Sequence, residues 1–454
     1  MPPQEVSVNP FVLAFVLGMG ILMFMLRRRY ALIPFLLVAI FVPLGQCLVA
    51  GGLHFYMFRI MIMIGWARVI IKGEYRTWRR NSIDTATLLT VVTGCTAYVI
   101  LWGTSDALVN RLGMAFNAFG IYLLIRFLVR SQKDWTVTLK ALAIMIIPVA
   151  GFMLIEFFTG RNAFAVFGGV PFETEIRDGR LRCQGPFMHP ILAGIFAAIL
   201  LPVFISQIWL QRKQTTITIL AVASAAAMTI TSACSGPILA AVAGMVGLGC
   251  WFIRKYMRLV RWGIAAIILG LQMVMKAPVY ALVGRVKVFN ASTGDHRFYL
   301  LDAWVHRFSE WCLLGTKTTA NWGYGLIDVT NMYVRVSVDG GLVSLICFIA
   351  VIVLCFRHVG LAVRSTSDPK QKKVLWAMGA SIFATMVGFM DIQLFDQTIT
   401  IWYLLTGVIS ALAIQARHYA VVPVPRQEPA AIVEQTLPVE AQVEGGLARR
   451  MFAS

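Results

Sequence analysis

Residues 190–208 read PILAGIFAAILLPVFISQI, a run without a single charged side chain. A helix needs about 20 apolar residues to cross the hydrocarbon core of a bilayer, which is about 30 Å thick, so this run is long enough to span a membrane. Similar runs recur along the chain, which is 59% hydrophobic and 13% charged. This composition excludes an ordinary soluble domain.

The sequence predicts an all-α fold, a polytopic transmembrane helix bundle of about 12–14 spans that occupies residues 1–416. No small-residue cleavage site follows the first run, so we expect the first span to remain as an anchor. The expected spans lie near residues 10–26, 31–50, 55–71, 85–102, 112–130, 137–158, 190–208, 215–232, 236–253, 263–281, 337–356, 375–394 and 398–416.

Lysine and arginine in the short loops indicate the orientation of the bundle. The basic clusters that fall on one side lie at residues 27–29, 72–80, 130–133, 212–213, 254–261 and 357–373. Cations accumulate on the cytoplasmic side of such proteins, so the N-terminus is expected outside. The formal net charge of +19 belongs mostly to this basic collar, which suits anionic lipid head groups and not nucleic acid.

The last part of the chain, residues 417–454, is rich in Pro, Glu, Gln, Val and Ala and has no sustained apolar period. We expect it to be a disordered cytoplasmic tail. No folded soluble domain fits between the spans, so function is expected in the bundle and in two long extracytoplasmic segments, residues 159–189 and 282–336.

The first extracytoplasmic segment carries Arg177, Arg180 and Arg182, followed by His189 at the start of a span. A basic cluster on the side where cations are rare needs a reason, and binding an anionic group such as a lipid-linked pyrophosphate is one. The structural alternative is that these arginines only form ion pairs with nearby acidic residues. Those acidic residues are Glu173, Glu175 and Asp178.

The second extracytoplasmic segment contains apolar residues at helical spacing over residues 297–314, which predicts an amphipathic helix at the membrane interface. His296 and Arg297 are expected at its start, where backbone N–H groups also favour an anion. Trp304 and Trp311 are expected to anchor the helix among lipid head groups. Residues 315–325, with Trp322 between glycines, are expected to form an irregular loop that contacts sugar rings.

Eight cysteines are scattered without a Cys-x-x-Cys pair or the spacing of metal ligands, so no metal or other cofactor is expected. Cys183 and Cys312 fall in the extracytoplasmic segments and could form a disulfide in an oxidising compartment.

The order of several short motifs resembles the O-antigen ligase and polysaccharide polymerase superfamily over about residues 50–416. The motifs are Arg-x-x-Gly-Pro-Phe-x-His-Pro ending at Pro190, Ser-Gly-Pro at 235–237, Asp-Val-Thr-Asn-Met-Tyr at 328–333, and Gly-Gly-Leu at 340–342. The resemblance implies a metal-independent glycosyltransferase of the bacterial inner membrane. Its substrates are sugars carried on undecaprenyl pyrophosphate, used at the periplasmic face among membrane lipids.

The chain departs from the ligases at one position. Ligases of this family typically have His-Asn where the large loop re-enters the membrane, and this chain has Thr330-Asn331. The departure favours a polymerase, which passes the glycan to another lipid-linked repeat unit, over a ligase, which passes it to lipid A core. The sequence does not indicate the oligomeric state.

The resemblance also implies roles for individual residues. The pyrophosphate leaving group needs its growing negative charge stabilised, and arginine can bind two phosphate oxygens at once, so we expect Arg182, Arg180 and Arg297 to form a clamp. Arg177 and Arg59 are further candidates, Arg59 because a charge within a span is costly unless it faces a cavity or interface. Arg126, also within a span, is the weaker candidate. The glycan is expected to contact Asn331, Tyr333 and Trp322.

The acceptor hydroxyl needs a proton acceptor, and the predicted outer face offers His189, His296 and Asp328. Asp328 is favoured because it lies two residues from the position of the ligase histidine. His189 has a structural alternative, since it precedes Pro190 and suits the first turn of a helix.

Ser-Gly-Pro at 235–237 is more typical of a break between two spans than of a nucleophile. Asp391 and Asp396 are expected to be solvated. A secondary transporter is the alternative from another class, but the charged residues of this chain cluster outside the spans.

Overall fold

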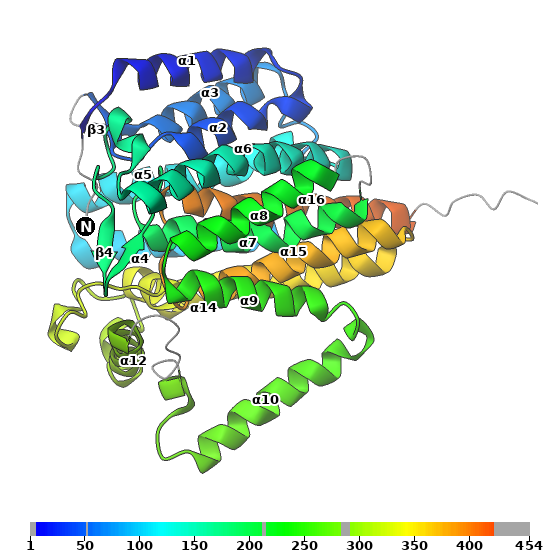
Figure 1. Ribbon diagram of the computed structural model, residues 1–454. Helices are drawn as coiled ribbons and strands as arrows, with labels where there is room; N and C mark the ends of the chain where they lie inside the picture. The colour runs from blue at the N-terminus through cyan, green and yellow to red at the C-terminus, as the bar shows by residue number, and fades with distance from the viewer. Residues whose placement is uncertain (1–5, 51–52, 211–214, 283–290, 422–454) are drawn as a thin grey trace, which may run out of the picture.

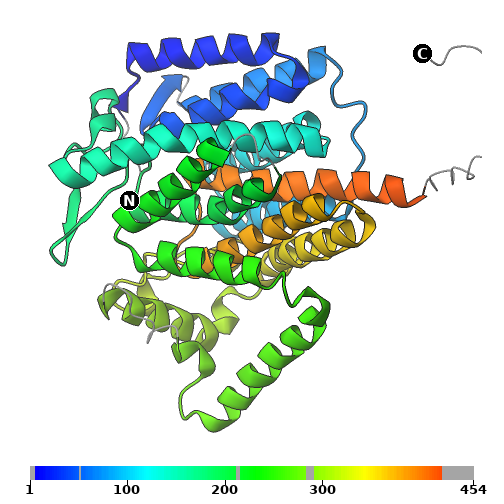
Figure 2. The ribbon, with the colours of Figure 1, turned by 45° about the vertical axis from the view of Figure 1, so that its right-hand side comes forward.

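The computed structural model describes residues 6–50, 53–210, 215–282 and 291–421. Within these ranges the chain is mostly helical, and the long helices lie side by side so that their connections gather at two ends of a bundle (Figures 1 and 2). The helices are α1 (Pro10–Met25), α2 (Leu32–Phe41), α3 (Met57–Ile71), α4 (Ser82–Trp102), α5 (Ser105–Leu128), α6 (Gln132–Thr159), α7 (Pro190–Leu210), α8 (Thr215–Thr231), α9 (Ser235–Gly249), α10 (Met257–Val274), α12 (Ala291–His306), α13 (Phe308–Trp311), α14 (Met332–Ser365), α15 (Pro369–Gly388) and α16 (Asp396–Val421).

Seven helical stretches in the described part are long and apolar enough to cross a membrane: α4, α5, α6, α7, residues 254–274, α14 and residues 397–415. Three more apolar helices, α1, α8 and α9, are shorter. Every predicted span contains a helix. The predicted helical membrane bundle is therefore confirmed in outline, and the larger span number stays a prediction.

The basic connections between helices lie at one end of the bundle, and the hairpin of β4 (Glu175–Arg177) and β5 (Arg180–Arg182) lies at the other (Figure 1). At the basic end, Arg28 pairs with Asp134 at 3.0 Å, and the Arg130 guanidinium donates to the carbonyl of Glu74. We call the opposite end, with the hairpin, the hairpin end. The alternation of the chain between two ends thus separates the basic collar from the two long segments predicted to be extracytoplasmic.

The chain is mostly helical, as predicted, but two small sheets that the sequence did not predict form at the hairpin end. The expected span at 31–50 ends early, because α2 stops at Phe41 and β2 (Gln46–Ala50) follows. Strand β2 pairs antiparallel with β3 (Leu53–Tyr56) and parallel with β1 (Val6–Ser7). Pro43 is the reason, since proline ends the helical hydrogen bonding and forces the residue before it out of the helical region. Val42 accordingly has φ −93° and ψ 117°.

The amphipathic helix of the second extracytoplasmic segment begins six residues earlier than predicted. Helix α12 starts at Ala291, so His296 and Arg297 lie in its second turn and the predicted anion site at its N-terminus is wrong. Trp304 and Trp311 also differ from the prediction. The Trp304 indole donates to Ser337 Oγ at 2.8 Å, and the Trp311 indole donates to the Trp304 carbonyl at 2.8 Å. The Trp304 ring therefore fastens the segment to α14, and the Trp311 ring fastens α13 to α12.

Helix α14 is interrupted at Gly341, which has φ 71° and ψ −172°. The segment that follows α13 fills this break, because the Leu342 N–H donates to the Cys312 carbonyl at 2.8 Å and the Thr316 N–H donates to the Val338 carbonyl at 2.9 Å. Backbone groups released by a broken helix need such partners when they are buried. The interrupted part of α14 and the segment that follows α13 are therefore held together by these hydrogen bonds.

Arg126 forms an ion pair with Asp84 inside the bundle and does not line a lipid path. Its guanidinium Nε lies 2.8 Å from Asp84 Oδ1, which also accepts hydrogen bonds from Tyr122 and Ser410. This buried cluster ties α4, α5 and α16 together near the basic end. Helix α16 runs to Val421, five residues into the predicted tail. The rest of that predicted tail, residues 422–454, lies outside the described residues.

Candidate functional site

The β4–β5 hairpin separates the three arginines of the first segment. Asp178 and Gly179 form its two-residue turn with φ of 52° and 73°, as a tight hairpin requires. In the antiparallel register, Arg177 lies opposite Arg180 next to the turn, and Glu175 lies opposite Arg182. Arg180 lies beside the turn and is exposed, whereas Arg182 lies at the end of β5 that is farther from the turn and is only 4% exposed. Of the three, only Arg182 is buried.

The Arg182 guanidinium makes two contacts that place it at the hairpin end of α9. Nη1 lies 2.7 Å from Glu175 Oε1, so Arg182 forms an ion pair with one of the nearby acidic residues, as the structural alternative predicts. Nη2 lies 2.9 Å from the Sγ of Cys234, the residue that precedes α9. The Nε atom is buried and has no hydrogen-bond partner among the described residues. The group therefore keeps one unused donor.

Glu156, near the end of α6, holds the chain that follows Arg182. Its carboxylate accepts the backbone N–H groups of Gln184 at 3.1 Å and Gly185 at 2.8 Å, and the Thr174 hydroxyl at 3.3 Å. Cys183 between them is buried, and all eight cysteines are free thiols, so the predicted disulfide with Cys312 is wrong. Glu156 thus fixes the backbone that follows Arg182 from within the bundle.

Arg297 reaches the same end of the molecule from α12. Its guanidinium Nη2 forms an ion pair with Asp391 Oδ1, and its Nε is buried without a hydrogen-bond partner in the described ranges. Burial lowers the pKa of Arg297 to about 10, and the nearby Cys234 opposes this change, so the side chain stays charged at neutral pH. The two arginines meet at the start of α9, because Cys234 contacts Arg182 and Gly236, two residues further on, lies against Asp391, the ion-pair partner of Arg297.

Asp391 contradicts the prediction that it is solvated, since it is only 5% exposed. Its carboxylate packs against the backbone of Gly236, where an added Cβ would lie 1.4 Å from Asp391 Oδ2. The Ser-Gly-Pro motif therefore needs glycine to leave room for this carboxylate. Helix α9 begins at Ser235, so the motif also forms the predicted break between two helices. The burial of Asp396 lies outside what the structure describes.

The three proposed proton acceptors lie near this cluster in different settings. His296 Nε2 lies 3.2 Å from the carbonyl oxygen of Asp328, so it serves as the donor there, and Asp328 itself is exposed. His189 Nδ1 accepts the Ile191 N–H at 3.2 Å, which is the structural role considered for it. Burial, followed by the charge of Arg182, lowers the pKa of His189 to about 4, although the carboxylates Glu175 and Asp328 oppose this shift. His189 is therefore neutral at physiological pH.

The low pKa of His189 predicts how stability depends on pH. Between the ordinary pKa of 6.5 and about 4, the unfolded chain binds more protons than the folded one, so stability falls as the pH is lowered through this range. We expect His189→Asn, whose Oδ1 can accept the Ile191 N–H, to lose less stability over the same range. Thermal unfolding of the detergent-solubilised protein at a series of pH values checks this. Identical curves for both proteins would show that His189 does not titrate this way.

The three residues predicted to contact the glycan make hydrogen bonds within the protein, and their contact with glycan stays a prediction. Asn331 caps α14, where its Oδ1 accepts the N–H groups of Tyr333 at 2.9 Å and Val334 at 3.2 Å. Tyr333 donates to the Met386 carbonyl at 3.2 Å. Trp322 is 7% exposed and donates to Glu310 Oε2 at 3.0 Å. Their polar groups are thus satisfied within the protein.

Arg59 lies apart from the two buried arginines. Its Nε donates to Asn117 Oδ1 at 2.9 Å and its Nη1 donates to the His54 carbonyl at 2.7 Å. Figures 1 and 2 show α3, which carries it, on the opposite side of the bundle from α12. The structure therefore does not bring Arg59 into the cluster.

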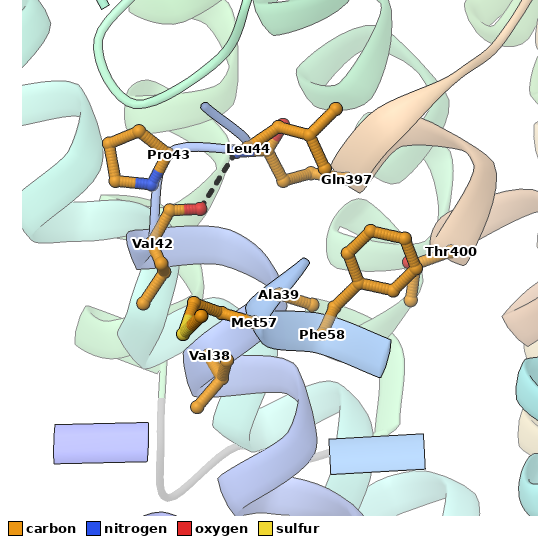
Figure 3. Close-up of a pocket in the computed structure, with 9 residues that line it drawn as sticks. All are labelled: Val38, Ala39, Val42, Pro43, Leu44, Met57, Phe58, Gln397 and Thr400. Carbon is orange, nitrogen blue, oxygen red and sulfur yellow. Dashed lines mark hydrogen bonds between the residues drawn. The ribbon is translucent and has the colours of Figure 1, made fainter. Parts of the chain in front are cut away.

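Gln397 connects the Arg182 loop, residues 183–189 between β5 and α7, to the end of α2. Its amide donates to the Pro186 carbonyl at 2.9 Å and to the Val42 carbonyl at 3.3 Å, beside a cavity of about 10 Å³ (Figure 3). A larger apolar groove of about 450 Å³ lies between α1, α2 and the short helix Ala163–Phe167. Asn162, which precedes that short helix, donates to the Gly185 carbonyl at 2.8 Å. The groove is thus linked to the Arg182 loop through one hydrogen bond.

We define the arginine cluster as Arg182, Cys234, Gly236, Arg297 and Asp391. Sequence reasoning missed Cys234 and Asp391, because a lone cysteine and an acid between two spans carry no local signal.

Among the described residues, no three His, Cys, Asp or Glu side chains are grouped so as to hold a metal ion. No protein-family model matches this chain, and no curated protein matches it.

Proposed function

We propose that this protein is a membrane-embedded glycosyltransferase that polymerises undecaprenyl-pyrophosphate-linked oligosaccharide repeat units. The observation that carries the proposal is the arginine cluster. Its two arginines come from distant segments and are 4% and 6% exposed, and each keeps a buried Nε without a hydrogen-bond partner among the described residues. A guanidinium binds phosphate oxygens in a planar fork and stays charged, so two of them suit a pyrophosphate.

The reaction needs little beyond stabilisation of the leaving group. An acceptor hydroxyl oxygen forms a bond to the anomeric carbon, the bond from that carbon to the phosphate oxygen breaks, and the pyrophosphate departs with the electron pair. Arg182 and Arg297 bind the growing negative charge, which is worth most where water is excluded. No metal ion takes part in this scheme.

The placement of charge supports a site at the outer face of the bacterial inner membrane. The basic connections gather at the end opposite the hairpin, and such connections favour the cytoplasm. The hairpin end then faces the periplasm and the C-terminal tail lies in the cytoplasm. The apolar groove of about 450 Å³ suits the hydrocarbon part of a lipid-linked substrate.

Polymerisation is favoured over ligation to lipid A core because Thr330 stands where the ligases carry a histidine. The test is transfer by the purified full-length protein in proteoliposomes supplied with an undecaprenyl-pyrophosphate-linked repeat unit, with and without a chelator. We expect a ladder of lengthening lipid-linked glycan that the chelator does not change. A single transfer to added lipid A core would replace the polymerase with a ligase. No transfer to either acceptor, with the lipid pyrophosphate bound, would overturn the proposal.

A further inference from the structure

Among the described residues, Asp391 is a buried carboxylate with an ion-pair partner but without further hydrogen-bond donors. It lies between α15 and α16 and forms an ion pair with Arg297. Neither of its oxygens receives a hydrogen bond of normal geometry from the part of the chain that the structure describes. A buried charge in this state costs free energy, so its retention needs a reason.

Asp84 shows what a structural carboxylate in this protein looks like. Its oxygens accept hydrogen bonds from Tyr122 at 2.5 Å, from Arg126 at 2.8 and 3.1 Å, from Ser410 at 2.8 Å and from the Asn81 N–H at 2.9 Å. Such a satisfied group fixes helices in place. Asp391 has the ion pair without these donors, and this difference favours a chemical role over a purely structural one.

The other candidate proton acceptors are less suited to the task. The Nδ1 lone pair of His189 already accepts the Ile191 N–H. His296 uses its Nε2 toward the Asp328 carbonyl, and the Asp328 side chain is exposed to water. Asp391, in contrast, touches an arginine assigned to the leaving group and lies against Gly236.

We propose that Asp391 is the general base of glycan transfer and that substrate binding activates it, an inference that rests on the proposed function. When the pyrophosphate binds, Arg297 exchanges the Asp391 carboxylate for phosphate oxygens. The carboxylate loses its compensating charge in a buried site, and its affinity for a proton rises. The acceptor hydroxyl then gives its proton to Asp391 as its oxygen bonds to the anomeric carbon. The base is thereby active only when the donor is in place.

The test separates binding from turnover in the full-length protein. Binding of undecaprenyl pyrophosphate and the rate of transfer under saturating donor are measured for the wild type and for Asp391→Asn. We expect the variant to lose about 100-fold or more of the transfer rate, as removal of a general base does. Donor affinity is expected to be equal or higher, because Arg297 no longer has to leave a carboxylate. The exposed Asp178→Asn is the matched control and keeps the wild-type rate.

A second variant tests the same role without removing the carboxylate. Gly236→Ala places a methyl group where Asp391 Oδ2 lies, so the carboxylate must shift. We expect its transfer rate to fall as in Asp391→Asn, with donor binding retained.

Three results would overturn the role of Asp391. The first is an Asp391→Asn protein that transfers at the wild-type rate. The second is a loss that comes entirely from weaker donor binding, which would make Asp391 a positioning residue of Arg297. The third is a loss of transfer in Asp328→Asn alone, which would make Asp328 the base. In each case the wild type still transfers glycan, so the proposed function stands. A wild type that binds donor and transfers nothing would overturn both.

Discussion

Arg182→Ala is expected to lower the rate of glycan transfer about 100- to 1000-fold, the effect of removing one preorganised donor from a charged transition state. The guanidinium is buried at the hairpin end of α9, contacts Cys234 and has an Nε that finds no hydrogen-bond partner in the described part of the chain. Its carboxylate partner, Glu175, has a side chain that is 43% exposed, so loss of this ion pair leaves a group that water can solvate. We therefore expect the fold to survive.

The measurement is transfer in proteoliposomes beside thermal unfolding of the same preparation. Arg182→Lys is expected to recover only part of the rate, because lysine keeps the charge and lacks the planar fork. Arg180→Ala is the comparison within the same strand, and its exposed side chain predicts a rate within about threefold of the wild type. Full activity of Arg182→Ala would exclude the clamp.

Gly341→Ala is expected to cause the largest loss of stability, about 3 kcal/mol or more, because it combines backbone strain with a steric clash. Gly341 has φ 71°, a region that side chains with a Cβ rarely adopt. The added Cβ would also lie 2.2 Å from the carbonyl oxygen of Leu313. The segment around Cys312 would have to move, and its hydrogen bond to Leu342 would break.

Thermal unfolding in detergent measures this loss, and limited proteolysis of the segment between α12 and α14 shows where the structure opens. Gly360→Ala, in the same helix, is the matched control, since nothing lies within 4 Å of its added Cβ. Alanine also suits a helix interior better than glycine. Equal stability of the two variants would mean that the break in α14 does not depend on its glycine.

The sequence predicted the helices well where the length of an apolar run decided the structure. It predicted them less well where contacts with other segments decided it. The run that opens at Pro190 became α7, which begins at that residue. The run at 31–50 failed in its second half because Pro43 and the pairing of β2 with β3 outweighed hydropathy. Trp304 and Trp311 have the composition of an interfacial anchor, yet their indoles bind within the protein.

The sequence singled out Arg182 and Arg297 among the candidate pyrophosphate ligands, because arginine can bind two phosphate oxygens at once. The structure buries both side chains, and their binding of pyrophosphate stays a prediction. Arg180 has the same chemistry and differs in its place, because it lies beside the hairpin turn and is exposed. The contact of Cys234 with Arg182 joins positions 52 residues apart, and no local pattern reports such a pair.

The sequence by itself determined that the protein is a bundle of apolar helices and where most of these helices lie, because bilayer thickness acts on each apolar run separately. Only the tertiary structure decided which charges meet. Asp391 reads as a solvated acid in the sequence and becomes the buried partner of Arg297 when α9, α12 and the α15–α16 connection pack together. Burial and pairing of a charge depend on groups brought from distant segments, and this is why the cluster could be identified only after the helices were assembled.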